Sequence, residues 1–249
     1  MRWEQGLLVL VLIVVAVTLP ACETTQETSA RLSKNAGSLL AVKGLRVTRE
    51  NPEVKVESET VLHDPNGVAA VVALRNTGAA QAVVPVAIDV RDAKGRSVYD
   101  NSVPGLDVSL TSLSSIARGQ RTFWVNNQIQ AAEAPRRVVA KVGTTKAPVS
   151  GALPRIGIAK LAYGKDISGV FARGVITNRS KIPQRRLVVA CISRRSTKVV
   201  AAGRAIVEKL QPAPTPKPVT FRVYFIGNPK GGTVSCVAPP TVLAAGSSS

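Results

Sequence analysis

The chain has 249 residues, of which 33 are Lys or Arg, 15 are Asp or Glu and only one is His, so its formal net charge is +18. One histidine and three cysteines are too few for a histidine-rich metal site, a four-cysteine zinc site or a pair of CxxC motifs. Apolar residues make up 45% of the chain, enough for one or two folded domains. We therefore expect a folded, basic protein that uses no metal or other cofactor.

The amino terminus has the proportions of a bacterial export signal. The apolar stretch from Leu7 to Leu19 is shorter than the roughly 20 residues of a membrane-spanning helix and suits a signal peptide. It ends in Leu19-Pro20-Ala21-Cys22, which resembles a bacterial lipobox; the resemblance implies that residues 1–21 are removed and that Cys22 carries a lipid. Pro20 stands where the lipobox has a small or aliphatic residue, so an uncleaved anchor that contains Cys22 is the alternative.

The segment that follows predicts a flexible, lipid-anchored tether over residues 22–44. From Glu23 to Ser38 it consists mainly of Thr, Gln, Glu, Ser and Asn, with few apolar side chains. A lipid on Cys22 would hold the folded part at the membrane surface without inserting it. We expect an exported protein, anchored to the bacterial cell membrane or outer membrane on its periplasmic or extracellular side.

From about Leu45 onward the chain shows the periodicity of β-strands. Apolar residues alternate with polar ones or form short β-branched runs, and turn sequences such as Asp64-Pro65-Asn66-Gly67 separate them. Beyond the signal, no stretch keeps a convincing helical pattern, and the abundant Val favours a pleated surface. The pattern predicts an all-β fold. The clearest predicted strands are residues 54–57, 68–74, 84–90, 123–125 and 138–142.

The strand pattern occurs twice along the chain. Shifting the sequence by 102 positions places Asn76-Thr77-Gly78 on Asn178-Arg179-Ser180, and later strands that begin with Phe123 and Phe221 match at a slightly shorter spacing. A period near 100 residues is too long for a solenoid and fits two tandem immunoglobulin-like β-sandwiches of about seven strands each. We predict sandwich domains at residues 45–147 and 155–243, a linker at 148–154 and a disordered tail at 244–249.

Each copy reads as an apolar strand, Asn-x-Gly or Asn-x-Ser, and a second apolar strand, and the first continues with Asp92-Ala93-Lys94-Gly95 and a Val-rich strand. This pattern resembles the FxLYD and related immunoglobulin-like domains of bacterial envelope proteins, over roughly residues 60–100 and 165–205. In that group the Asn step closes a turn between two core strands. The second copy has Arg194-Arg195-Ser196-Thr197 in place of the Asp-Ala-Lys-Gly string, and neither copy has the aromatic-Leu-Tyr-Asp string. Families of this group are mostly of unknown or binding function, so the resemblance implies no catalytic residue.

Cys191 and Cys236 form an even pair once Cys22 is assigned to the lipid. In an exported protein such a pair predicts a disulfide. At the 102-residue spacing Cys191 corresponds to Asp89, and aligning the last Val-rich strands matches Cys236 with Lys141. Strand alternation then places the disulfide on an outer sheet face, where the first copy would have an ion pair between Asp89 and Lys141. Two reduced, buried thiols are the alternative.

The excess positive charge belongs to the second copy, because residues 22–147 hold 16 basic and 12 acidic residues whereas residues 148–249 hold 16 basic and two acidic ones. A field of this sign attracts anions, which near a membrane are phospholipid headgroups, wall polymers and acidic protein surfaces. Nucleic acid is less favoured because aromatic residues are few, and charge that serves only solubility is the alternative. We predict anion binding by two clusters at opposite ends of the strand 187–193, namely Arg179, Lys181, Arg185 and Arg186, and Arg194, Arg195 and Lys198.

The residues show no catalytic constellation. His63 is placed in a predicted turn, and no Gly-x-Ser-x-Gly sequence accompanies it. The sequence therefore predicts a non-enzymatic, envelope-tethered binding or assembly lipoprotein whose basic second domain makes the contacts. A structural subunit of a secretion or pilus-type assembly and a nucleic-acid-binding envelope protein are the alternatives, and the oligomeric state is left open.

Overall fold

The computed structural model describes residues 44–131, 133–145, 149 and 151–243, all within one unit that runs from Val42 to Ser249. The predicted signal peptide, the predicted lipidation site Cys22, the predicted tether up to residue 43 and the predicted tail at 244–249 lie outside the described residues. In the described part of the chain, no helix has the length and hydropathy needed to cross a membrane.

The all-β prediction is confirmed, since the regular elements of the described chain are antiparallel strands apart from the short 3-10 helix η1 (Val108–Leu110). In the first sandwich, one sheet has the order β1-β2-β6, and in the other β3 pairs with β4, β5 and β7. The bounds are β1 Val54–Asp64, β2 Gly67–Asn76, β3 Gln81–Arg91, β4 Ser97–Asp100, β5 Ser112–Ile116, β6 Arg121–Ile129 and β7 Arg137–Val142.

The second sandwich follows in tandem, with one sheet in the order β12-β9-β8 and the other in the order β13-β11-β10-β14. The bounds are β8 Ile156–Asp166, β9 Gly169–Asn178, β10 Gln184–Arg195, β11 Lys198–Leu210, β12 Val219–Tyr224, β13 Ile226–Gly227 and β14 Thr233–Val237.

The two sandwiches repeat the same order of strands, as the sequence repeat suggests, and the second copy has one extra residue. The β1–β2 and β8–β9 hairpins correspond at a spacing of 102 residues, but the turn before β10 is one residue longer, so Gln184 begins β10 as Gln81 begins β3, at a spacing of 103. Two unusual backbone positions support this register, because Val83 and Arg186, also 103 residues apart, have φ angles of 47° and 46°.

A buried asparagine closes the same turn in both sandwiches. The Oδ1 of Asn76 accepts from the Gly78 N–H at 3.0 Å, and the Oδ1 of Asn178 accepts from the Ser180 N–H at 3.0 Å. Their side-chain amides donate to carbonyls farther along the turn, at 2.6 and 2.7 Å. Because both side chains are fully buried, these bonds satisfy polar groups that would otherwise be costly to enclose.

Each sandwich has its own core between its two sheets. Trp124 on β6 and Phe221 on β12 occupy corresponding places in these cores, since their register partners are Val72 and Gly174. The predicted match between Phe123 and Phe221 is therefore wrong by one residue, which places Phe123 on the opposite face of its sheet. The main core side chains are Val72, Leu74, Val86, Val90 and Trp124 in the first sandwich and Ile176, Leu187, Val189, Phe221 and Val223 in the second.

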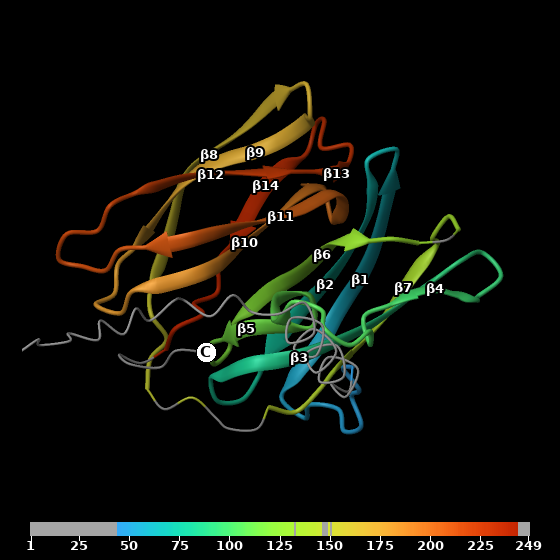
Figure 1. Ribbon diagram of the computed structural model, residues 1–249, viewed down its shortest axis with the longest axis horizontal. Helices are drawn as coiled ribbons and strands as arrows, with labels where there is room; N and C mark the ends of the chain where they lie inside the picture. The colour runs from blue at the N-terminus through green and yellow to red at the C-terminus, as the bar shows by residue number, and fades with distance from the viewer. Residues whose placement is uncertain (1–43, 132, 146–148, 150, 244–249) are drawn as a thin grey trace, which may run out of the picture. The chain divides into compact units, whose positions relative to one another are not determined.

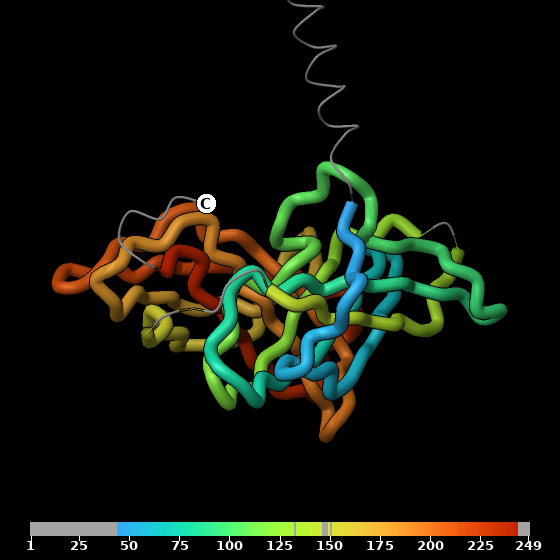
Figure 2. Tube along the Cα trace, turned by 90° about the horizontal axis from the view of Figure 1, so that it is seen from below, coloured from blue at the N-terminus to red at the C-terminus, as the bar shows by residue number. Residues whose placement is uncertain are grey.

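A third buried layer joins the two sandwiches face to face. Outward side chains of β2 and β6 pack against outward side chains of β10, β11 and β13. The sheets therefore stack in four layers, which Figure 1 shows as β3 and β5, then β1, β2 and β6, then β10 and β11, and then β8, β9 and β12. Figure 2 shows the trace of the first sandwich, blue to green, in contact with that of the second, orange to red. The layer consists of Ala69, Val71, Phe123, Val125, Ala190, Ile192, Ala202 and Ile226.

Candidate binding groove and basic surface

A disulfide joins Cys191 and Cys236, which confirms the predicted pairing. The two residues are direct register partners on β10 and β14, with their Cα atoms 4.1 Å apart. Cys191 is fully buried in the core of the second sandwich together with Val189, so the bond lies on the inner face of its sheet. The predicted location on an outer face is wrong.

The inserted residue before β10 explains this error. With the corrected spacing, Cys191 corresponds to Ile88 rather than Asp89, and its partner Cys236 corresponds to Ala140, the register partner of Ile88. A slip of one residue moves a strand residue to the opposite face. The expected ion pair of Asp89 is also different, because its carboxylate bonds to Arg91 at 2.6 Å, and Lys141 is instead the register partner of Ala87.

The two predicted basic clusters lie at opposite ends of β10. Arg185 is paired with Lys209 near one end of the β10–β11 ladder, and Arg195 with Lys198 at the other. A strand rises about 3.3 Å per residue, which separates the ends by roughly 30 Å. The two clusters therefore cannot form one anion site on a single chain.

Two of the predicted anion ligands are engaged with the first sandwich. Arg186 lies 2.8 Å from Asp107 of the first sandwich and 3.8 Å from Glu208. The guanidinium of Arg194 lies over the ring of Phe123, 5.9 Å from its centroid. Both arginines bridge the two sandwiches. Of the other predicted residues, Arg195 donates to the carbonyl of Lys230.

A polar network surrounds Asp107 where the sandwiches meet. Hydrogen bonds from Ser109, followed by the bond and charge of Arg186, outweigh partial burial and lower the pKa of Asp107. The buried Arg204 of β11 donates to the backbone carbonyl and hydroxyl of Ser109, at 3.0 and 2.7 Å, and burial lowers its pKa. The same carbonyl accepts from Trp124. These contacts fix the short helix η1 against the second sandwich.

The outer face of the β8-β9-β12 sheet carries a pair of arginines that belong to neither predicted cluster. Arg173 and Arg222 are register partners, and both are exposed. They correspond to Val71 and Val125 of the first sandwich, also register partners, which are buried in the layer between the sandwiches. The sequence does contain a sign of this exposed pair, because the 102-residue spacing aligns the apolar Val71 with the charged Arg173. An apolar packing surface has thus become a cationic surface in the second copy.

Arg222 belongs to a small cluster on this face. It lies 3.6 Å from Asp166, and its guanidinium stands 5.0 Å from the centroid of the Phe171 ring. Tyr224 packs against Phe171 and donates a 2.7 Å hydrogen bond to Asp166. Arg173 has no carboxylate partner among the described residues, so its charge is available to an outside anion.

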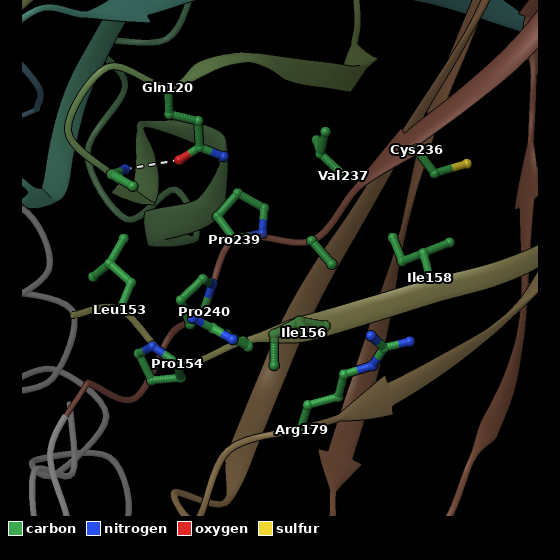
Figure 3. A pocket seen from close by; sticks show the side chains of 13 residues that line it. Gln120, Leu153, Pro154, Ile156, Ile158, Arg179, Cys236, Val237, Pro239 and Pro240 are labelled. Atoms are coloured by element: carbon green, nitrogen blue, oxygen red, sulfur yellow. Dashed lines mark hydrogen bonds between the residues drawn. The ribbon is translucent and has the colours of Figure 1, made fainter.

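A groove of about 590 Å³ opens where the edges of the two sheets of the second sandwich face each other (Figure 3). Figure 3 shows Ile156 and Ile158 of β8, Val237 of β14 and the Pro239-Pro240 segment around it, with Arg179 running alongside Ile156. The remaining lining residues are Ala117, Gln120, Leu153, Pro154, Arg155, Cys236 and Ala238.

Arg155 and Arg179 place positive charge at the rim of this groove. The Arg179 N–H donates to the Arg155 carbonyl at 2.9 Å, which brings the end of β9 next to the start of β8. Gly157 allows the Arg179 side chain to lie against β8, because a Cβ atom there would come within 2.7 Å of its Nε. Neither arginine has a carboxylate partner in the described chain. Arg155 was absent from the predicted clusters, because it precedes a strand and stands apart from other basic residues.

Hydrogen bonds hold one wall of the groove in place. Ser114 and Ser115 of β5 donate to the carbonyls of Pro239 and Pro240, at 3.0 and 2.8 Å. The buried amide of Gln184 donates to the carbonyl of Val242 and accepts from two backbone N–H groups just beyond the prolines. The wall is therefore formed before any ligand arrives.

No group of three or more candidate metal ligands occurs among the described residues. His63, expected in a turn, lies on β1 as the register partner of Val68 and is exposed. Comparison with known protein families and with curated proteins finds no match to this chain. The geometry by itself offers a grooved, cationic surface suited to binding.

Proposed function

We propose that this chain is a non-enzymatic lipoprotein of the bacterial envelope, anchored through Cys22, whose second sandwich binds an anionic partner. The observation that carries the proposal is the lack of neutralising acids in that sandwich. Among its described basic residues, only Arg186 and Arg222 lie within ion-pair distance of a carboxylate. The others create a field that attracts anions and raises their rate of encounter.

Several of the unpaired cations gather at the end of the second sandwich that carries the groove. Antiparallel pairing brings together the start of β8, the end of β9 and the start of β10 at this end. Because Arg186 is engaged with Asp107, the contact surface consists of Arg155, Arg179, Lys181 and Arg185. We call these four residues the groove-end cluster.

Phospholipid headgroups, anionic wall polymers and acidic surfaces of envelope proteins are the partners that such a cluster favours next to a membrane. An assembly subunit is a second candidate, because the stacked sandwiches show that sheet faces of this chain pack against other sheets. A nucleic-acid partner has less support, since Tyr163 and Tyr224 are the only exposed aromatic side chains of the described structure.

The proposal is tested with the chain carrying Cys22→Ser, so that no lipid attaches the protein to a membrane. Binding to phosphatidylglycerol-containing vesicles, isolated wall polymer and duplex DNA is measured at several salt concentrations, with phosphatidylcholine vesicles as the neutral control. We expect binding to at least one anionic probe that weakens as salt rises. Equal binding to the neutral vesicles, or no binding to any anionic probe, would contradict the proposal.

A further inference from the structure

We propose that the groove binds an extended acidic peptide, which adds a strand to the free edge of β14. This inference rests on the proposed function and names the partner of the groove. β14 pairs only with β10 among the described strands, so its other edge presents unpaired backbone groups. Strand addition to such an edge takes its affinity from main-chain hydrogen bonds and its specificity from alternate side chains.

The first sandwich shows what a closed edge looks like at the same place. There the carboxylate of Glu59 on β1 reaches across to β7 and accepts a 2.5 Å hydrogen bond from the Ala140 N–H. This bond joins the two sheets and satisfies an edge donor. In that sandwich, a side chain of the chain itself occupies the position that an added strand would take.

The second sandwich lacks this closure. Glu59 corresponds to Leu161, whose apolar side chain packs against the core and offers no acceptor. Ala140 corresponds to Cys236, which lines the groove. The groove therefore borders the β14 residue whose counterpart in the first sandwich is bonded to a glutamate.

The backbone of β14 is oriented to donate into the groove. The Ala140 N–H points away from β3, because it donates to Glu59. The N–H of Cys236 has the same orientation. In antiparallel strands, partners that share no hydrogen bonds have closer Cα atoms than hydrogen-bonded partners, and the Cα atoms of Cys236 and Cys191 are only 4.1 Å apart. The N–H groups of Cys236 and, two residues on, Ala238 thus face the open edge.

The lining specifies the side chains of the added strand. Successive residues of an extended peptide point to opposite sides. The set that faces β8 would pack on Ile156 and Ile158, which favours apolar side chains. Carboxylates at the positions where the peptide passes the rim would meet Arg155 and Arg179. The fixed proline wall reduces the ordering cost of binding.

The test uses an acetylated octapeptide of alternating valine and glutamate, with a valine–lysine octapeptide as the control. Binding to the Cys22→Ser chain is followed by NMR, together with hydrogen exchange of the Cys236 and Ala238 amides. We expect saturable binding of the acidic peptide, at least tenfold slower exchange of both amides, and no binding of the basic peptide.

Two variants separate strand addition from simple charge attraction. Leu161→Glu introduces the residue that closes the first sandwich, and Ala238→Pro removes an edge donor without changing the charge. Each should weaken peptide binding at least tenfold while leaving salt-dependent binding to anionic probes within twofold. If Leu161→Glu fails to fold because it disturbs the core, Ala238→Pro alone decides the question.

Three outcomes would overturn the inference: no binding of the acidic peptide, binding without slower exchange of the two amides, or binding that Ala238→Pro leaves unchanged. If any of these occurs while anionic vesicles or wall polymer still bind, the proposed function stands and the strand-addition inference fails. Loss of all anionic binding in the unmodified sequence would contradict both.

Discussion

Exchanging the disulfide for the residues at the same place in the first sandwich separates its cross-linking effect from its packing effect. The variant Cys191→Ile with Cys236→Ala reproduces the Ile88–Ala140 pair, which is compatible with this fold. The disulfide spans 45 residues. In the chain-entropy treatment, a closed loop of about that length stabilises a protein by about 4 kcal/mol.

The expected result is a decrease of about 4 kcal/mol in the free energy of unfolding, measured by urea denaturation. This corresponds to a melting temperature lower by about 8–16 °C in a unit of roughly 200 residues. The double variant Cys191→Ala with Cys236→Ala removes the cross-link and also leaves a cavity, so it should be less stable again by about 2 kcal/mol or more. Because the buried layer couples the sandwiches, each protein should unfold in a single transition.

Equal stability of the Ile–Ala variant and the unmodified protein would refute this reasoning. It would mean that the cross-link restricts the unfolded chain much less than its span implies. Identical stability of the Ile–Ala and Ala–Ala variants would instead contradict the placement of residue 191 in the core. The unmodified protein with its disulfide reduced, measured in parallel, should show the decrease in the free energy of unfolding that comes from losing the cross-link.

Three further predictions follow from the contacts between and around the sandwiches. Ile192→Asp places an unpaired charge in the buried layer and should lower the free energy of unfolding by about 3–5 kcal/mol. In calorimetry the two sandwiches should then unfold separately. A single transition at an unchanged temperature would contradict the role of this layer in joining the sandwiches. Arg173→Val with Arg222→Val gives the open face of the second sandwich the apolar character that Val71 and Val125 give the buried face of the first. The variant should therefore self-associate in sedimentation velocity. A monodisperse variant would count against the equivalence of the two faces. Because the pKa of Asp107 is lowered in the folded protein, its contribution to stability is complete above about pH 4 and is lost as the pH falls through that lowered pKa. Asp107→Asn should therefore reduce the loss of stability between neutral and acid pH by a few tenths to about 1 kcal/mol, and a loss identical to that of the unmodified protein would refute this.

The fold class and the repeat could be predicted from the sequence because they depend on local patterns. Alternating apolar residues and the paired Asn turns recur at nearly the same spacing, and each is satisfied within one hairpin. The side of the sheet on which the disulfide lies could not be predicted in the same way. In β10 the run Ala190-Cys191-Ile192 is buried on both faces, so no alternation of polarity shows which side faces the core.

The candidate site was harder to predict because its parts are far apart in the chain. Arg155 precedes β8 and Arg179 follows β9, and only the pairing of these strands brings them together. A search for runs of basic residues instead selected Arg186 and Arg194, which the structure uses between its own sandwiches. The wall at Pro239-Pro240 depends on serines of the first sandwich, a contact that no local pattern encodes.

The most direct measurement of the central claim is the affinity for phosphatidylglycerol-containing vesicles after charge reversal at the groove-end cluster. Each basic residue near an anionic surface contributes about 1 kcal/mol, so Arg155→Glu, Arg179→Glu, Lys181→Glu and Arg185→Glu together should weaken binding about a thousandfold. The matched control reverses four exposed residues of the first sandwich, Arg49, Lys94, Arg136 and Arg137, with the same change in net charge. We predict that this control binds within about tenfold of the unmodified chain. Equal losses in the two variants would contradict the claim that the second sandwich carries the binding surface.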